Sequence, residues 1–83
     1  MFNLAQTKKL SVETTSETIT LSAGRTQYTP TPPTGAFALI GGFTNAGDTQ
    51  WGGVRLYNDS WQAFFYGSSS GASGTTFVWL VEK

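Results

Sequence analysis

The chain has 83 residues, no cysteine and no histidine, and its five basic residues balance five acidic ones to give a formal net charge of zero. This length is typical of one small domain, in which disulfides, thiolate chemistry and histidine-based catalysis are excluded. Five scattered cations also do not form the basic stripe that a nucleic-acid-binding surface needs. A small domain that lacks cross-links favours self-association as a source of stability.

The first half of the chain alternates apolar and polar residues with period two, which indicates β-strands. The alternation runs through residues 9–13, breaks at 14–16 and resumes at 18–22, so we expect a hairpin with one polar face. Residues 1–7 precede this hairpin as a candidate flexible tether. The following segment, residues 28–35, contains all three prolines and predicts a stiff, extended connection that crosses from one sheet to another.

The middle of the chain changes character and becomes more apolar. Residues 36–40 are apolar at every position, which predicts a strand that is covered on both faces. Two further strands are predicted at residues 51–57 and 61–66, joined by a tight turn at Asn58-Asp59-Ser60, because Asn and Asp tolerate left-handed backbone conformations.

The chain ends with a Ser/Gly-rich stretch and a last apolar strand. Residues 67–75 read GSSSGASGT and predict a flexible hairpin loop, and residues 76–81 predict a strand that is apolar on both faces. The sequence as a whole therefore predicts one all-β domain over residues 1–83. We expect a small antiparallel β-sandwich or barrel of about six short strands with no significant helix.

The predicted strands differ in how much apolar surface they carry. The first two have a polar face, whereas those at residues 36–40, 61–66 and 76–81 do not, and a chain of 83 residues is too short to cover both faces of these three strands. The outward set therefore predicts a subunit interface, with Phe64, Tyr66, Val78 and Leu80 as its candidate residues.

Enzymatic function is excluded by the available side chains. Without histidine a Ser-His-Asp triad cannot form, and no serine stands three residues before a lysine to offer the Ser-Lys variant. The carboxylates are few, and most lie in predicted turns or at a terminus, where a raised carboxylate pKa is hard to achieve. We therefore predict no catalytic residue, no metal site and no cofactor.

The aromatic residues leave a second interpretation open, since three Trp and three Tyr could stack against sugar rings. The candidate ligand-binding residues are Trp51, Arg55, Tyr57, Asn58, Trp61 and Gln62. The competing interpretation is that these side chains only fill the core or an interface, where Trp and Phe are usually found. A third hypothesis is a monomeric adaptor that uses the Pro30-x-x-Pro33 spacing as a ligand for a partner domain.

The order of features over residues 17–83 resembles small β-modules of tail, baseplate and receptor-binding proteins from tailed phages of Gram-positive hosts. The segments that carry this resemblance are Leu21-Ser22-Ala23-Gly24, Ala36-Phe37-Ala38-Leu39-Ile40-Gly41-Gly42, Asn58-Asp59-Ser60 and Val81-Glu82-Lys83. Such modules are commonly trimeric, and some belong to proteins that recognise cell-wall saccharides. The family offers no fixed motif, so no binding residue is carried over from it.

The resemblance and the residues together give one expectation for function. We expect a non-enzymatic structural module of a phage virion, or a virion-associated one, that self-associates through apolar strand faces. Carbohydrate binding to the host cell wall is the alternative. The expected partners are copies of the same chain, with a trimer favoured, other virion proteins or a host saccharide, but neither nucleic acid nor membrane. The expected location is the virion, or the host cytoplasm during assembly, without a signal peptide or a membrane span.

Overall fold

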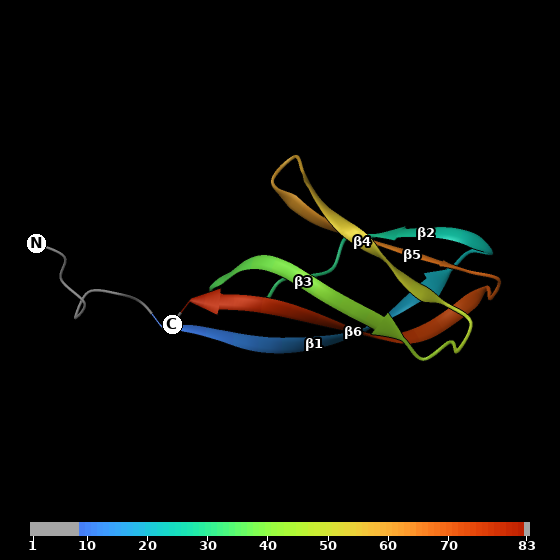
Figure 1. Cartoon of the computed structure of the whole chain (residues 1–83), viewed down its shortest axis with the longest axis horizontal. Coiled ribbons are helices and arrows are strands. Elements are labelled where there is room, and N and C mark those ends of the chain that lie inside the picture. The colour runs from blue at the N-terminus through green and yellow to red at the C-terminus, as the bar shows by residue number, and fades with distance from the viewer. Residues whose placement is uncertain (1–8, 83) are drawn as a thin grey trace, which may run out of the picture.

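The computed structural model describes residues 9–82, which form six β-strands in two antiparallel sheets (Figure 1). The strands are β1 (Leu10–Leu21), β2 (Gly24–Tyr28), β3 (Ala36–Thr44), β4 (Gln50–Tyr57), β5 (Ser60–Gly67) and β6 (Gly71–Glu82). We call the sheet with strand order β1–β6–β3 the long sheet, and the sheet with order β2–β5–β4 the short sheet. The predicted small all-β sandwich is thus confirmed, while the candidate tether at residues 1–7 lies outside the described residues.

The N-terminal strand β1 is continuous, so the predicted hairpin within residues 9–22 is wrong. All twelve of its residues pair with β6, from Leu10 opposite Glu82 to Leu21 opposite Gly71. The break in the pattern arises because the apolar residues change face along one strand. Val12 is exposed on the outer face and Ile19 is buried on the inner one, since their positions differ by an odd number.

The last strand begins earlier than predicted and shortens the Ser/Gly-rich loop to residues 68–70. Residues 71–75 pair with the end of β1, although their side chains are small. The loop is tied to its neighbour, because the hydroxyls of Ser68 and Ser69 both donate to the carboxylate of Asp48. These hydrogen bonds lower the pKa of Asp48 below its usual value of 3.8.

The proline-rich segment between β2 and β3 connects the short sheet to the long sheet. It ends in a turn in which the Ala36 amide donates to the Pro33 carbonyl at 3.1 Å. The Glu82 amide donates to the Gly35 carbonyl at 3.0 Å, which fixes the end of the connection against the C-terminal end of β6. The connection is therefore part of the folded domain.

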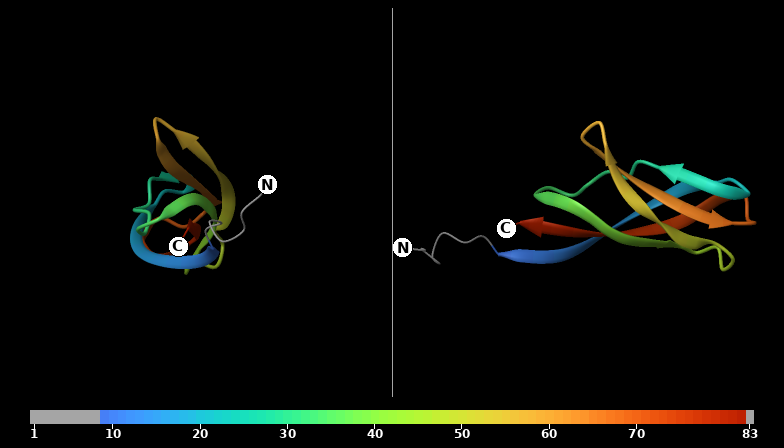
Figure 2. Two further views of the ribbon diagram at one scale, coloured as in Figure 1. Left: turned by 90° about the vertical axis from the view of Figure 1, so that its left-hand side faces the viewer. Right: turned by 45° about the horizontal axis from the view of Figure 1, so that its top comes forward.

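Among the six strands of residues 9–82, β4 and β5 are the only two that follow each other in the chain and pair as a hairpin. Its turn residues Asn58 and Asp59 have φ values of 49° and 62°, so the predicted tight turn is confirmed. The end of this hairpin rises away from the long sheet, as both views in Figure 2 show. The β4 side chains near this end are accordingly exposed, including Leu56 with 56% of its surface.

The core lies between the sheets and is built mainly from β6 and β5. The buried apolar residues are Ile19, Leu21, Leu39, Ala63, Phe65, Phe77, Trp79 and Val81. Phe65 of the short sheet meets Phe77 of the long sheet edge to face, with ring centroids 6.2 Å apart. The fully buried Trp79 donates its indole N–H to the Thr15 hydroxyl at 2.9 Å, which satisfies the polar group of the largest core side chain.

A carboxylate on β1 holds the start of the proline-rich connection. Glu17 accepts hydrogen bonds from the Tyr28 hydroxyl at 2.6 Å and from the Thr31 amide at 3.0 Å. The Tyr28 ring also stacks on Phe77 at 5.8 Å. The hydrogen bond to Glu17, followed by burial and the negative charge of the carboxylate, raises the pKa of Tyr28 above its usual value of 10.0.

We expect this contact to become visible on alkaline titration. A tyrosine pKa that is raised in the folded state contributes stability below pH 10.0, and this contribution is lost as the pH rises through the folded-state pKa. Near-ultraviolet absorbance should show one phenol, identified by its loss in Tyr28→Phe, that ionises above pH 10.0. Replacing Glu17 by Gln should shift that ionisation to lower pH. An unchanged ionisation in Glu17→Gln would contradict the proposed cause.

Candidate functional site

The outer face of the long sheet carries an unbroken group of apolar side chains. Val12 of β1 is paired with Leu80 of β6, which in turn is paired with Ala38 of β3. The neighbouring residues extend this row along the sheet. We define the apolar face by its large side chains, which are Leu10, Val12, Phe37, Ile40, Phe43, Val78 and Leu80.

Two irregularities in β3 increase the apolar content of this face. The register shifts between Ala36 and Ala38 and again between Leu39 and Gly41, and each shift inserts one extra residue, Phe37 or Ile40. Both inserted residues are large, with 43% and 46% of their surfaces exposed. The apolar face therefore presents more large side chains to solvent than a regular strand would.

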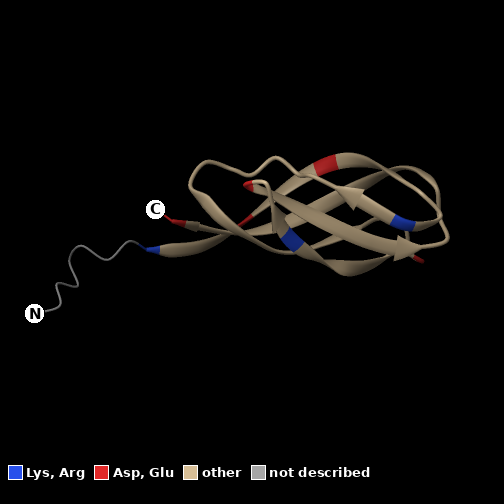
Figure 3. Ribbon diagram, turned by 90° about the horizontal axis from the view of Figure 1, so that it is seen from above, with Lys and Arg blue, Asp and Glu red and all other residues tan. Residues whose placement is uncertain are grey.

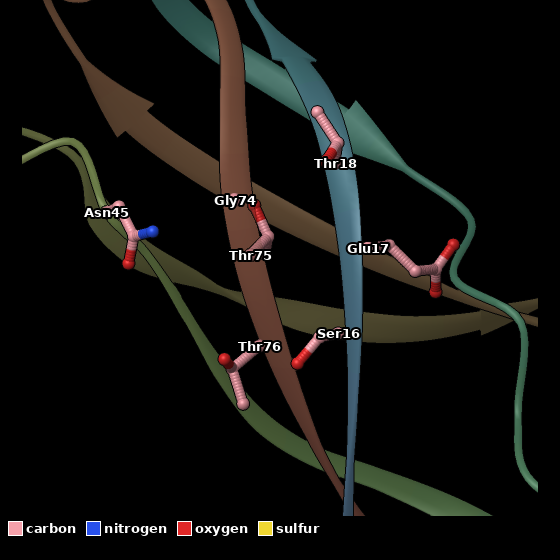
Figure 4. A pocket seen from close by; sticks show the side chains of 7 residues that line it. All are labelled: Ser16, Glu17, Thr18, Asn45, Gly74, Thr75 and Thr76. Atoms are coloured by element: carbon pink, nitrogen blue, oxygen red, sulfur yellow. The ribbon is translucent and has the colours of Figure 1, made fainter.

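The other end of the same sheet surface is polar and slightly hollowed (Figure 4). The hollow has a volume of about 220 Å³, and Ser16 lies beside Thr76 within it, across the β1–β6 pair. Gly74 makes room for the side chain of Asn45, because a β-carbon on Gly74 would lie 2.9 Å from the Asn45 Nδ2 atom. Figure 4 shows Glu17 pointing away from Ser16, toward the proline-rich connection. Apart from Glu17, whose carboxylate is turned toward the connection, the residues that line the hollow are neutral.

The outer face of the short sheet has a different chemistry, in which two arginines lie over aromatic rings. The guanidinium carbon of Arg25 is 4.8 Å from the centre of the Phe64 ring. That of Arg55 is 5.5 Å from the same ring and 4.6 Å from the ring of Tyr57. We call this group, together with Gln27 and Gln62, the arginine–aromatic strip. Each cation is thus held against a ring face, which is a favourable contact.

The four predicted interface residues lie on two opposite faces of the sandwich. Val78 and Leu80 belong to the apolar face, whereas Phe64 and Tyr66 lie on the outer face of the short sheet. Tyr66 covers the backbone of Gly52, since a β-carbon at that position would collide with its ring. The structure thus brings together Val78 with Leu80, and Phe64 with Tyr66, but not all four residues.

The six predicted ligand-binding residues are also divided between different surroundings. Arg55, Tyr57 and Gln62 lie together in the arginine–aromatic strip, and Asn58 lies in the adjoining turn. Trp51 is packed against the core, with its ring 5.4 Å from that of Phe65.

Trp61 packs partly against the core but also borders the proline-rich connection. Together with residues 29–32 and the turn residues Asp59 and Ser60, it lines a hollow of about 240 Å³. The Trp61 side chain is therefore separated from the arginine–aromatic strip, because it points to the opposite side of β5 from Gln62.

Sequence reasoning missed residues on both surfaces. The alternation predicts a strand whose polar residues face outward, so that Leu10 and Val12 would face the core. In the structure these two side chains face solvent, each with 61% of its surface exposed. Arg25 and Gln27 alternate with the inward Thr26 and Tyr28. This period-two pattern was the one feature of the sequence that could have placed Arg25 and Gln27 on an outer face. Their place on the short sheet depends on the pairing of β2 with β5, which lie far apart in the chain.

The carboxylates of residues 9–82 do not form a metal-binding cluster. Within residues 9–82, no group of three or more acidic side chains is placed to hold a metal ion. Glu17 and Asp48 are already engaged with the connection and the Ser/Gly-rich loop. Across the same residues, no helix has the length and apolar character needed to cross a membrane.

Comparison with known proteins does not assign a role to either outer face. No protein family, no curated protein and no solved structure matches the chain. The function must therefore be argued from the two faces themselves.

Proposed function

We propose that the chain is a non-enzymatic structural module that assembles with copies of itself through the apolar face of the long sheet. Because the order of sequence features resembles that of small phage tail modules, we further propose that the module belongs to the tail or baseplate region of a phage virion. The observation that carries the proposal is the group of large apolar side chains on a sheet surface that no other part of residues 9–82 covers.

The exposure of this face is large for a domain of this size. Leu10 and Val12 each have 61% of their surfaces exposed, and Phe43 has 58%. Monomeric proteins rarely leave contiguous apolar patches of this kind in water, because each half-exposed large side chain forgoes part of the free energy, about 1.5–3 kcal/mol, that full burial would contribute. Covering the patch with a second protein surface recovers that free energy.

A second copy of the chain fits this face better than a strongly charged partner does. None of its defining residues is charged, and charged positions are sparse along the ribbon as a whole (Figure 3). The formal net charge of zero also gives copies little electrostatic reason to repel one another. An isologous or cyclic contact between apolar faces is therefore favourable.

The supporting sequence features indicate a module that functions by packing. The chain has no histidine or cysteine, and among the described residues no group of three or more acidic side chains is placed to hold a metal ion. The phage modules that it resembles are commonly trimeric, which favours a homotrimer. Such a module would build or decorate the tail tip and contact other virion proteins.

The test is the native mass in solution of the chain and two matched variants of β1. Val12→Glu places a charge within the apolar face. Thr20→Glu is the control, because it places the same charge near the C-terminal end of β1, outside the apolar face. We expect the unmodified chain and Thr20→Glu to form the same oligomer. Val12→Glu should remain monomeric at the same concentrations, because assembly would bury an unpaired carboxylate.

Light scattering on a size-exclusion column across a dilution series makes this measurement. Because Val12 is exposed in the single chain, Val12→Glu should retain the thermal unfolding of a folded domain. A monomeric mass for the unmodified chain throughout the series would overturn the proposal. An oligomer that persists in Val12→Glu would also overturn it.

A further inference from the structure

The arginine–aromatic strip lies on the sheet opposite to the apolar face and has no role in the assembly proposed above. We propose that it binds an acidic saccharide chain, whose carboxylate or phosphate groups pair with Arg25 and Arg55. The inference goes beyond the structural function, because it assigns a ligand to a separate surface.

The positive charge of the strip is not neutralised by its polar contacts. Arg25 donates through Nη2 to the Gln27 amide oxygen at 2.8 Å, and Arg55 donates through Nε to the Gln62 amide oxygen at 2.7 Å. Both acceptors are neutral, and among residues 9–82 no ion pair is formed by either arginine. A guanidinium group has five N–H donors, so each retains donors for an anionic ligand.

The strip is also held in place before any ligand arrives. Gln27 and Gln62 are joined by a hydrogen bond of 3.2 Å, and this contact links the two arginine–glutamine pairs across β2 and β5. The rings of Phe64 and Tyr57 fix the guanidinium groups from below. Such ordering reduces the entropy lost when a ligand binds.

The spacing of the cations suits a polymer with repeated acidic groups. Both guanidinium groups lie within 5.5 Å of the Phe64 ring centre, so they are neighbours on one surface. Two adjacent acidic units of one chain can therefore contact both arginines. The glutamine amides and the Tyr57 hydroxyl, next to them, supply hydrogen-bonding groups for sugar hydroxyls.

The same geometry argues against single-stranded nucleic acid as the ligand. Affinity for nucleic acid depends on stacking of bases on aromatic rings and on several cations that contact phosphates. Here guanidinium groups already cover a face of Phe64 and of Tyr57, and the strip contains only two cations. An acidic saccharide needs neither exposed ring faces nor a long basic groove.

The proposal is tested by calorimetric titration of the full chain with two acidic polymers and one neutral polymer. Polygalacturonate supplies carboxylates, phosphomannan supplies phosphates, and unmodified mannan serves as the neutral control. We expect at least one acidic polymer to bind, with affinity that falls as salt is added, and no binding of mannan. Binding of polygalacturonate would identify carboxylate as the recognised group, and binding of phosphomannan would identify phosphate.

Charge-removing variants then assign the site. Arg25→Gln and Arg55→Gln should each weaken binding about two- to fivefold, as expected for one exposed ion pair, and the double variant should bind far more weakly than either. Lys9→Gln removes an exposed cation outside the strip and should leave affinity unchanged.

The inference would be overturned by binding of neither acidic polymer, by equal binding of mannan, or by unchanged affinity in the double arginine variant. Tighter binding of a single-stranded oligonucleotide than of both acidic polymers would also overturn it, in favour of nucleic acid. Thermal unfolding of the double variant should remain that of a folded domain, with only a small loss from the surface ring contacts, since Arg25 and Arg55 are exposed.

Discussion

Replacing Trp79 by Ala should lower the free energy of unfolding by about 3–5 kcal/mol, which is typical for truncation of a large core side chain. Trp79 is fully buried at the centre of the long sheet, where it is held between β1 and β3. Domains of this size have only about 4–12 kcal/mol of stability. The loss is a large share of that stability, so chemical denaturation should show a midpoint at much lower denaturant concentration than for the unmodified chain.

Replacing Trp79 by Phe separates packing from hydrogen bonding at the same position. The phenyl ring retains most of the apolar burial but loses the indole N–H that donates to Thr15. We expect a smaller loss, of about 1–2 kcal/mol, from the missing hydrogen bond and reduced volume. Equal losses for Trp79→Ala and Trp79→Phe would contradict the central place of this ring in the core.

The second large effect is expected from Gly35→Ala, at the end of the proline-rich connection. Gly35 has a φ of 84°, and a β-carbon there would lie 2.8 Å from the backbone oxygen of Glu82. The substitution therefore forces the connection away from the C-terminal end of β6. It also weakens the hydrogen bond from the Glu82 amide to the Gly35 carbonyl.

Gly24→Ala is the matched control, because Gly24 also has a positive φ, of 93°, but its β-carbon would contact nothing within 4 Å. Gly24→Ala should lose about 1–2 kcal/mol from backbone strain alone. Gly35→Ala should lose about 1–3 kcal/mol more, from the added steric contact. Equal unfolding free energies for the two variants, measured by chemical denaturation, would show that the Gly35 contact with β6 is unimportant.

Period-two alternation was sufficient to predict the class of fold and most strand positions. The faces of β5 follow the pattern directly, because Ala63 and Phe65 are buried while Tyr66 is exposed. The tight turn at Asn58 and Asp59 followed from residues that tolerate left-handed backbone conformations. These features are local, so a single sequence contains the information for them.

The errors arose where a local pattern had two interpretations. A change of face within a continuous strand looks like a break, and β1 contains such a change between Val12 and Ile19. Small residues usually form loops, but Gly71–Thr75 become a strand because β1 offers them a partner. Pairing with a distant segment overrides the weak propensity of the residues themselves.

The candidate surfaces depended on information that is not local. The sequence predicted outward apolar residues at Val78 and Leu80, and the structure places them on the apolar face. It could not group Arg25 with Phe64 and Arg55, because these residues come from β2, β5 and β4 and meet only through the strand order. Strand order is set by the packing of the whole domain.

The most direct test of the assembly proposal is the reactivity of a single cysteine placed on the apolar face. The chain has no native cysteine, so Val12→Cys and Leu56→Cys each carry one thiol, at positions that are 61% and 56% exposed. The rate of reaction with a bulky maleimide is measured over a range of protein concentrations. We predict that the Val12→Cys thiol becomes protected as concentration rises, while the Leu56→Cys thiol does not. Equal rates at all concentrations for Val12→Cys would contradict assembly through this face.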